Sequence, residues 1–257
     1  MNDRSRRGAV ALLLSMGPLQ VAALAGVVDV VAAAKPSVLA VGTANALKNP
    51  RFSFRGTGFV VGDGNHLITN SHVLPAAADA DPADRLTVVL AKPRDDRDVR
   101  AATIVANDPV HDLALLKFEG PAVPVLPLAD PAMTAKDGSA VVLIGYPIGV
   151  VLGFVPVTHR GIVAATVGIA QPQPSSRQLN ERTVARMRQG SFDVYQLDAT
   201  AYPGNSGSPL LDADTGKVLG VINSVFVKAS RESALSQPTG ISYAIPVRHV
   251  LELMDRK

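Results

Sequence analysis

Residues 203–211 read Pro203-Gly204-Asn205-Ser206-Gly207-Ser208-Pro209-Leu210-Leu211. Glycines on both sides of Ser206 let the backbone adopt conformations that are closed to residues with a Cβ, and they let peptide N–H groups approach whatever the serine attacks. The same residue types also form ordinary surface turns. The stretch therefore predicts either a nucleophile exposed just ahead of an apolar strand or a simple turn.

A base for this serine is available upstream. A serine hydroxyl is a weak nucleophile until a neighbouring group removes its proton. His72 follows the apolar run 66–69, which an Asp-Gly-Asn turn joins to the preceding run, so we expect the histidine at a strand end that faces a cleft. A neutral imidazole there could take the serine proton and later return it to a leaving amine. A lone histidine is more often a core or surface residue.

A carboxylate that could orient the imidazole lies farther along the chain. Asp112 immediately precedes the apolar run 113–118, which would bury it at a sheet edge. A buried carboxylate needs a partner, and a hydrogen bond from an imidazole N–H would both satisfy it and fix the histidine tautomer. An aspartate at the start of a strand is equally well explained as a turn former.

The apolar pattern predicts an all-β protein, because short runs of Val, Ile, Leu and Thr recur between Gly, Pro, Asn and Asp. The predicted strands are 38–41, 57–61, 66–69, 86–90, 99–105, 113–118, 140–144, 161–167, 194–197, 209–211, 218–227 and 240–245. A stretch rich in proline, residues 121–131, separates two β halves. Pro246 can open a C-terminal helix, and a polar helix is expected over 177–188 within a long insertion, residues 171–192.

Composition excludes several function classes. The hydrophobic fraction of 47% suits a globular core, whereas a net charge of +3, the absence of Trp and an aromatic fraction of 4% argue against nucleic-acid binding. The chain has no cysteine, so disulfides, thiolate metal ligands and a cysteine nucleophile are excluded together.

The first 25 residues resemble a secretory signal. Arg4, Arg6 and Arg7 form a positive start, an apolar stretch follows, and Ala23-Leu24-Ala25 provides a small-x-small cleavage pattern. Apolar residues continue beyond that pattern, so an uncleaved membrane anchor is the alternative. Both interpretations predict an exported protein, periplasmic or secreted.

Taken together, these segments resemble the trypsin-like serine proteases of the chymotrypsin fold, and most specifically the protease domain of the bacterial HtrA (Deg) family. The segments that carry the resemblance are 56–60, 67–73, 112–117, 161–163, 196–199, 203–207, 220–223 and 241–246. The resemblance implies a protease domain over 26–257 built of two six-stranded antiparallel β-barrels with a short C-terminal helix. The barrels are expected at about 36–120 and 135–245, and the helix at 246–256.

The same resemblance assigns roles to particular residues. It makes Ser206 the nucleophile, His72 the general base and then acid, and Asp112 the residue that orients His72. The backbone N–H groups of Gly204 and Ser206 would form the oxyanion hole. The residues implied in substrate binding are Thr200, Asn223 and Ser224.

The chain also departs from the family pattern. Ser208 replaces the glycine that usually follows Ser-Gly, and we expect it to crowd or stiffen the turn. Thr200 suggests no buried charge in the specificity pocket, so small or medium apolar residues are expected at the cleavage site. We expect no PDZ domain after the protease domain, so substrate selection would depend on surface loops, the 171–192 insertion, a partner or none of these. A homotrimer is an open expectation.

The sequence gives weaker support to other kinds of site. The histidines lack metal-site spacing, so no metal or organic cofactor is expected. Gly56 and Gly58 lack the third glycine of a nucleotide-binding turn. His249 as the base for Ser206 is disfavoured, because it is expected on the surface of the terminal helix. The sequence predicts an exported serine endopeptidase acting on unfolded or misfolded polypeptides, with a non-catalytic β-barrel binding or chaperone module as the alternative.

Overall fold

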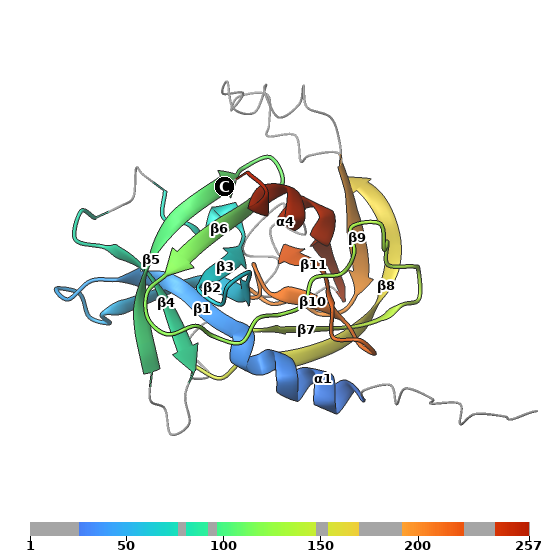
Figure 1. Ribbon diagram of the computed structural model, residues 1–257, viewed down its shortest axis with the longest axis horizontal. Helices are drawn as coiled ribbons and strands as arrows, with labels where there is room; N and C mark the ends of the chain where they lie inside the picture. Colours follow the sequence, from blue (N-terminus) through green and yellow to red (C-terminus); the bar gives the residue numbers. More distant parts are fainter. Residues whose placement is uncertain are drawn as a thin grey trace, which may run out of the picture.

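Two closed antiparallel β-barrels make up the protein (Figure 1). The computed structural model describes residues 26–76, 81–91, 97–147, 154–169, 192–223 and 240–256. Each barrel has six strands within this part of the chain, in the spatial orders β1-β2-β3-β6-β5-β4 and β10-β11-β12-β9-β8-β7. With the short C-terminal helix, this confirms the predicted fold class.

The strand bounds follow the predicted apolar runs closely. The first barrel consists of β1 (Val38–Ala44), β2 (Phe52–Val61), β3 (His66–Thr69), β4 (Arg85–Ala91), β5 (Arg97–Asp108) and β6 (Leu113–Phe118). The second consists of β7 (Ala140–Gly145), β8 (Val157–Ile169), β9 (Phe192–Asp198), β10 (Pro209–Asp212), β11 (Val218–Asn223) and β12 (Ile241–Pro246). The long strands β2, β5 and β8 extend several residues beyond the prediction, because polar residues interrupt the apolar signal there. The predicted strand 218–227 continues into residues outside the described ranges.

Both long strands carry irregularities that help the sheets close. The register of β5 against β6 shifts between Ile104 and Ala106, and that of β8 against β9 shifts between Val163 and Ala165. An extra residue in one strand of a pair bends that strand and increases its twist. These bends let β5 and β8 wrap around their barrels.

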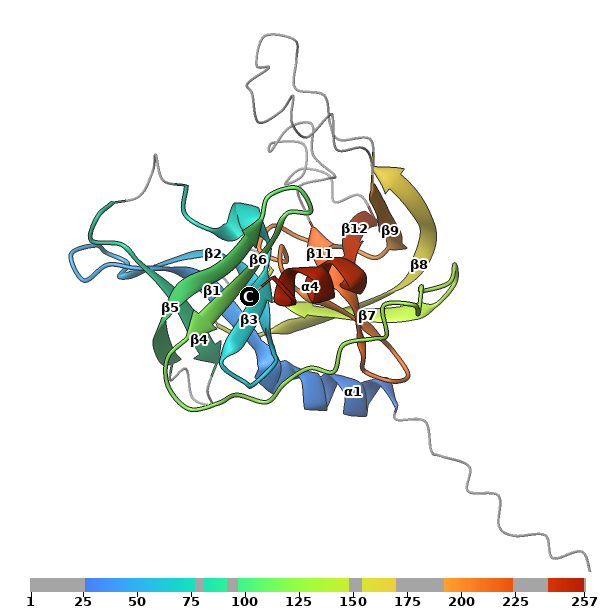
Figure 2. The same ribbon diagram turned by 45° about the horizontal axis from the view of Figure 1, so that its top comes forward.

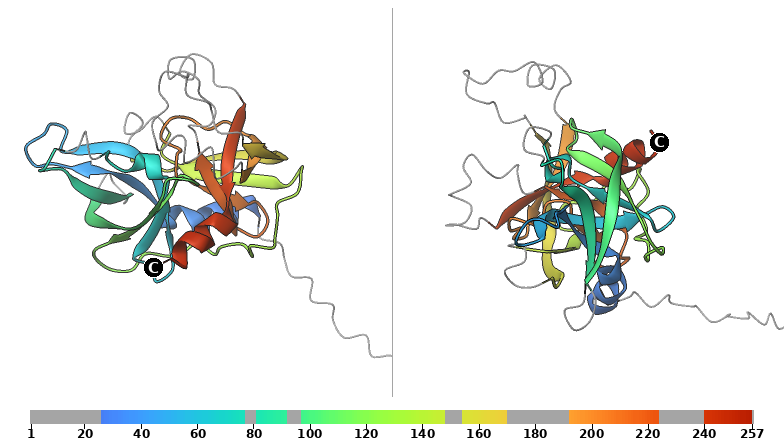
Figure 3. Two further views of the ribbon diagram at one scale, coloured as in Figure 1. Left: turned by 90° about the horizontal axis from the view of Figure 1, so that it is seen from above. Right: turned by 90° about the vertical axis from the view of Figure 1, so that its left-hand side faces the viewer.

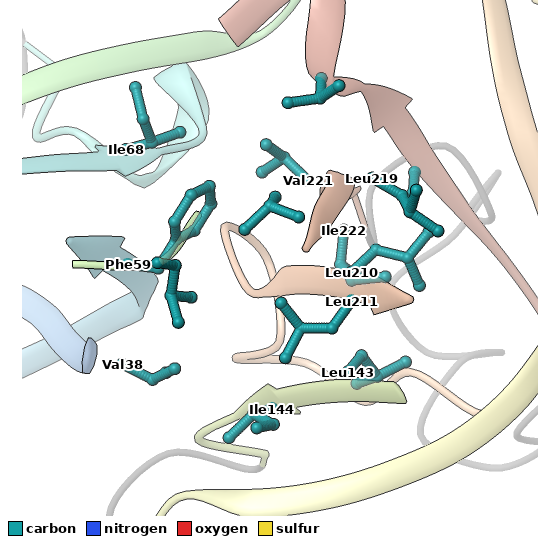
Figure 4. Packing of buried hydrophobic residues seen from close by; sticks show 14 of the residues in the cluster. Val38, Phe59, Ile68, Leu143, Ile144, Leu210, Leu211, Leu219, Val221 and Ile222 are labelled. Atoms are coloured by element: carbon teal, nitrogen blue, oxygen red, sulfur yellow. The ribbon is translucent and has the colours of Figure 1, made fainter. Parts of the chain in front are cut away.

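One hydrophobic core joins the barrels. Phe59 and Ile68 of the first barrel belong to the same buried cluster as Leu143, Leu210 and Ile222 of the second (Figure 4). A second buried cluster, which includes Leu39, Val60, Leu67 and Leu116, belongs to the first barrel alone. Since the side chains of a strand alternate between faces, residues next to each other in β2 serve different clusters. The shared core fixes how the barrels sit against each other.

The connecting segment, residues 119–139, runs between β6 and β7 (Figure 2). Its backbone N–H groups at Val123 and Leu126 donate to Gly64 and Val60 of the first barrel, at 2.9 and 3.1 Å. Pro127 accepts a hydrogen bond of 2.8 Å from Val218 of the second barrel. The proline-rich stretch is therefore a link, as predicted, and it is hydrogen-bonded to both barrels.

In the described ranges, two α-helices flank the barrels (Figures 1 and 3). The helix α1 (Val27–Ala34) lies in a region whose apolar residues suggested a continuation of the leader; it buries Val30 and Ala34, and the one-turn 3-10 helix η1 (Lys35–Ser37) joins it to β1. The helix α4 (Val247–Met254) follows Pro246 as predicted and contacts β5 and β6 of one barrel and β11 and β12 of the other. The predicted polar helix at 177–188 lies outside the described residues.

Candidate active site

His72 is held in a short 3-10 turn directly after a buried strand. The turn η2 (Ser71–Val73) follows β3, whose last residue Thr69 is fully buried. Arg55 of β2 reinforces the turn, because its guanidinium donates hydrogen bonds of 2.6 Å to the Val73 carbonyl and 3.0 Å to the Leu74 carbonyl. The imidazole itself remains 32% exposed. His72 is thus fixed through its backbone while its ring reaches solvent.

Asp112 occupies the turn between β5 and β6 in an unusual backbone conformation. Its φ is 54°, and it is the one non-glycine residue with positive φ in the described ranges. Asp and Asn visit this left-handed region more readily than bulkier residues do. The Asp112 carbonyl accepts hydrogen bonds from the Ser71 N–H at 3.1 Å and from the Asn70 side-chain amide at 2.9 Å. These contacts tie the aspartate's backbone to the turn that carries the histidine.

The carboxylate of Asp112 accepts three hydrogen bonds. Oδ1 accepts from the His72 backbone N–H at 2.9 Å, while Oδ2 lies 2.6 Å from His72 Nδ1 and accepts from Asn223 Nδ2 at 2.7 Å. A carboxylate only accepts, so Nδ1 of His72 is the protonated nitrogen of the neutral ring. Nε2 is left with its lone pair, which is the arrangement that a general base requires.

Ser206 lies in a tight turn built as the glycine pattern predicts. Gly204 and Gly207 have φ values of 100° and 87°, which an L side chain rarely adopts. The turn is closed by hydrogen bonds of 3.0 Å from Asn205 N–H to the Tyr202 carbonyl and from Ser208 N–H to the Asn205 carbonyl. Ser206 is only 4% exposed, so the turn does not expose this residue as its sequence suggested.

Contacts across the barrels place this turn near the histidine and the aspartate. The Thr57 N–H of β2 donates to the Ser206 carbonyl at 2.9 Å, and the Gly207 N–H donates to the carbonyl of Ile222 at 2.9 Å. Asn223, the next residue of β11, bonds to Asp112. Segments from both barrels therefore meet around one site, which brings the turns of His72, Asp112 and Ser206 together.

The three residues expected to bind substrate lie in different situations. Thr200 follows β9 in the segment that leads to Gly204, and it is partly exposed. Asn223 directs its side-chain amide to Asp112, which is a supporting contact that the sequence did not reveal, because the two residues are 111 positions apart. Ser224 lies outside the described residues.

Ser208 is packed as tightly as its replacement of a glycine suggested. Its side chain is fully buried, and a Cβ added at Gly145 would overlap its Oγ. The same added Cβ would lie 2.8 Å from Asn205 Oδ1 and 3.1 Å from Thr57 Oγ1. The hydroxyl of Ser208 and the side-chain amide of Asn205 have no hydrogen-bond partner in the part of the chain that the structure describes. Gly145 is therefore a position where β7 must approach the turn without a side chain.

A second aspartate–histidine pair lies in the same β5–β6 connection, just before Asp112. Asp108 Oδ2 is 2.9 Å from His111 Nδ1 and 3.2 Å from an Arg256 nitrogen. Burial acts to raise the pKa of Asp108, but the hydrogen bonds from His111, together with the charges of His111 and Arg256, outweigh it, so the pKa lies below its ordinary value. The ring of His111 stacks on that of His249, with centroids 4.0 Å apart.

The expectation that His249 lies on the surface of the terminal helix was wrong. His249 is 8% exposed, because its ring packs against the rings of His111 and Phe192. Its Nδ1 lies 3.0 Å from the Glu252 carboxylate. Burial lowers the pKa of His249. The ring of His249 is therefore packed between side chains and hydrogen-bonded to Glu252.

Among the residues that the structure describes, no three His, Asp or Glu side chains are arranged to hold a metal ion. The turns that meet here instead carry the hydroxyl of Ser206 and an imidazole that is hydrogen-bonded to a carboxylate. That set of groups suits nucleophilic attack on a carbonyl carbon.

Comparison with protein families gives a match to enzymes that attack a carbonyl carbon with a nucleophile. Residues 56–221 match the model of the trypsin-like peptidase domain. Over 201 residues, or 78% of the chain, it is 30% identical to a "Probable periplasmic serine endoprotease DegP-like" protein of Marinomonas sp. and 32% identical to one of Pseudomonas fluorescens. The aligned region covers 35% and 34% of these relatives, so the chain spans about a third of their length.

A solved structure is similar across nearly the whole chain. The active form of the Rv3671c protease from M. tuberculosis superimposes with a TM-score of 0.64 at 26% sequence identity. The match covers 96% of this chain and 93% of that one.

Proposed function

The chain belongs to the trypsin-like peptidase family, and from this premise we propose that it is an exported serine endopeptidase that cleaves unfolded or misfolded polypeptides. The observation that carries the proposal is the set of contacts at Asp112. Its carboxylate meets His72 Nδ1 at 2.6 Å and the His72 backbone N–H at 2.9 Å, so ring and backbone are held by one group. Such a pair leaves Nε2 ready to accept a proton.

In the proposed acylation step, Ser206 Oγ attacks the carbonyl carbon of the scissile peptide bond while His72 Nε2 takes its proton. Asp112 stabilises the imidazolium ion that forms. The carbonyl oxygen becomes an oxyanion, which the backbone N–H groups of Gly204 and Ser206 would bind. When the C–N bond breaks, His72 returns the proton to the departing amine, and the acyl group remains on Ser206.

Deacylation repeats these steps with water as the nucleophile. His72 takes a proton from the water molecule as its oxygen attacks the acyl carbon, and it then returns a proton to Ser206 Oγ as the ester bond breaks. The products are a carboxylic acid and the free enzyme. Every proton is exchanged through His72, so this chemistry draws on no metal ion or organic cofactor.

Support for the cellular context comes from the sequence and the relatives. The first 25 residues have the pattern of an export signal, and the curated relatives are named as periplasmic serine endoproteases. In the described ranges, no helix combines the length and apolar character needed to span a bilayer. Membrane anchoring through the N-terminal segment, assembly into a trimer and a preference for small or medium apolar residues remain predictions.

Degradation of an unfolded protein tests the proposal. Purified protein should fragment reduced, carboxymethylated casein, and Ser206→Ala should abolish fragmentation while retaining the wild-type far-UV spectrum and unfolding transition. A metal chelator in the assay should leave the rate unchanged. If wild type and Ser206→Ala both bind casein and neither fragments it, the protein is a binding module of protease descent.

A further inference from the structure

The hydroxyl of Thr57 links the two barrels at the turn that carries Ser206. Thr57 lies in β2 and is fully buried. Its Oγ1 donates a hydrogen bond of 2.7 Å to the Gly204 carbonyl and accepts one of 3.1 Å from the Tyr146 N–H. A single hydroxyl thus satisfies a backbone acceptor before Ser206 and a backbone donor just after β7.

The backbone of Thr57 adds a second contact to the same turn. Its N–H donates to the Ser206 carbonyl at 2.9 Å. The carbonyls of Gly204 and Ser206, which lie on either side of Asn205, are therefore both held by one residue of the opposite barrel. The Thr57 carbonyl is in turn held by the Thr69 hydroxyl at 2.7 Å, so the linking residue is itself fixed.

This link matters because glycine does not hold a conformation by itself. Gly204 has a φ of 100°, and with no Cβ it has wide access to other backbone conformations. Any rotation about its backbone changes the direction of the neighbouring peptide planes, including the N–H groups assigned to the oxyanion hole. A hydrogen bond to the Gly204 carbonyl restrains that rotation from outside the turn.

We propose that Thr57 is a positioning residue for the oxyanion hole. Its hydroxyl holds the Gly204 carbonyl, so that the N–H groups of Gly204 and Ser206 point toward the substrate oxygen. The inference rests on the proposed peptidase function and adds a residue that touches no substrate. Preorganised donors act most strongly when they need no rearrangement during the reaction. The hydroxyl supplies that preorganisation from the first barrel.

Three variants separate the hydroxyl from the shape of the side chain. Thr57→Val keeps the branched shape and the backbone N–H but leaves the Gly204 carbonyl and the Tyr146 N–H without their partner. Thr57→Ser keeps the hydroxyl. Thr87→Val is the matched control, because Thr87 is also buried and its hydroxyl donates to a backbone carbonyl, that of Arg85 at 2.8 Å, on strand β4.

The readouts are kcat and KM for a fluorogenic peptide, the rate of labelling by a fluorophosphonate, and urea unfolding. A misplacement of about 1 Å can cost on the order of 100-fold in rate, so we expect Thr57→Val to lower kcat and the labelling rate by about that factor. KM should change less than kcat, because the lost contribution is made in the transition state. Thr57→Ser should restore most of the rate, and Thr87→Val should retain wild-type kcat.

Three results would overturn the inference: wild-type kcat in Thr57→Val, an equal loss in Thr57→Val and Thr57→Ser, or an equal loss in the Thr87→Val control. If Thr57→Val does not fold, Thr57→Ala replaces it, since the smaller side chain removes the hydroxyl without overpacking, and the same comparisons apply. Wild-type protein that is folded yet neither cleaves the peptide nor reacts with the probe overturns the proposed function itself.

Discussion

Replacing Asp112 with Asn disturbs the site at its most constrained group. Both carboxylate oxygens accept hydrogen bonds, Oδ1 from the His72 backbone and Oδ2 from the His72 ring and Asn223. An asparagine amide has one acceptor and one donor group, so it cannot accept at both positions. Either orientation therefore sets an NH₂ group against an existing donor.

The two orientations have different consequences. With its NH₂ group at Oδ1, the new residue opposes the His72 backbone N–H and pushes the turn away. With its NH₂ group at Oδ2, it opposes Asn223 and favours the His72 tautomer that is protonated at Nε2, which cannot accept the proton of Ser206. In a related protease of known mechanism, this exchange lowers kcat by about 10⁴, or about 5.4 kcal/mol at 1.36 kcal/mol per tenfold.

The assay compares Asp112→Asn with a matched exchange at the neighbouring pair. Asp108→Asn also removes a carboxylate that bonds to a histidine, His111 at 2.9 Å, but this pair contacts α4 through the His111–His249 stack and the residue Arg256 beyond the end of α4. We expect Asp112→Asn to lower kcat for a fluorogenic peptide by about four orders of magnitude while the folded fraction remains near wild type. Asp108→Asn should reduce stability more than kcat. A loss of only a few-fold in folded Asp112→Asn would refute the role assigned to Asp112.

Three further predictions concern the surroundings of the site. Gly145→Ala should destabilise the protein by about 1–3 kcal/mol in urea unfolding and slow fluorophosphonate labelling, because the added Cβ overlaps the Ser208 hydroxyl. A second substitution, Ser208→Gly, should partly relieve both effects. Full stability and activity in Gly145→Ala would contradict this packing. Asn223→Ala removes a hydrogen bond of 2.7 Å to the Asp112 carboxylate, a contact worth about 1.5–3 kcal/mol. We therefore expect kcat to fall by about 10- to 100-fold with KM little changed. An unchanged kcat would show that the contact is dispensable. Burial lowers the pKa of His249 below its ordinary value of 6.5, so as pH falls the histidine is protonated in the unfolded chain before it is protonated in the folded protein, and the free energy of unfolding falls below about pH 6.5. His249→Phe should weaken that decline between pH 7.5 and 5. An equally steep decline in the variant would show that His249 is not its source.

The sequence predicted the barrels well, because their interior strands are short, apolar and bounded by turn residues. The runs at 66–69 and 113–118 match β3 and β6 residue for residue. The helix α1 was missed, since Val27 to Ala34 continues the apolar character of the leader and its burial depends on packing that local pattern does not contain.

The sequence predicted the backbone of the Ser206 turn, because that feature depends on neighbouring residues in the chain; the roles of His72, Asp112 and Ser206 stay predictions. The glycine-flanked turn of Ser206 has the positive φ values that its sequence requires. The supporting contacts were not predictable in the same way. Thr57 lies 147 residues from Gly204 in sequence, and Asn223 lies 111 residues from Asp112. Local sequence patterns do not show that the folded barrels bring the two members of each pair together. His249 was misjudged for the same reason, because a stacked partner from β5–β6 buries it.

The most direct test of the account is the location of the covalent adduct formed by a fluorophosphonate. The protein should react with one equivalent of the probe, and peptide mass spectrometry should place the phosphonyl group on Ser206, with no adduct in Ser206→Ala and a strongly reduced rate in His72→Ala. Folded wild-type protein that stays unmodified, or that carries the adduct on another residue, would contradict the assignment of Ser206 as the nucleophile.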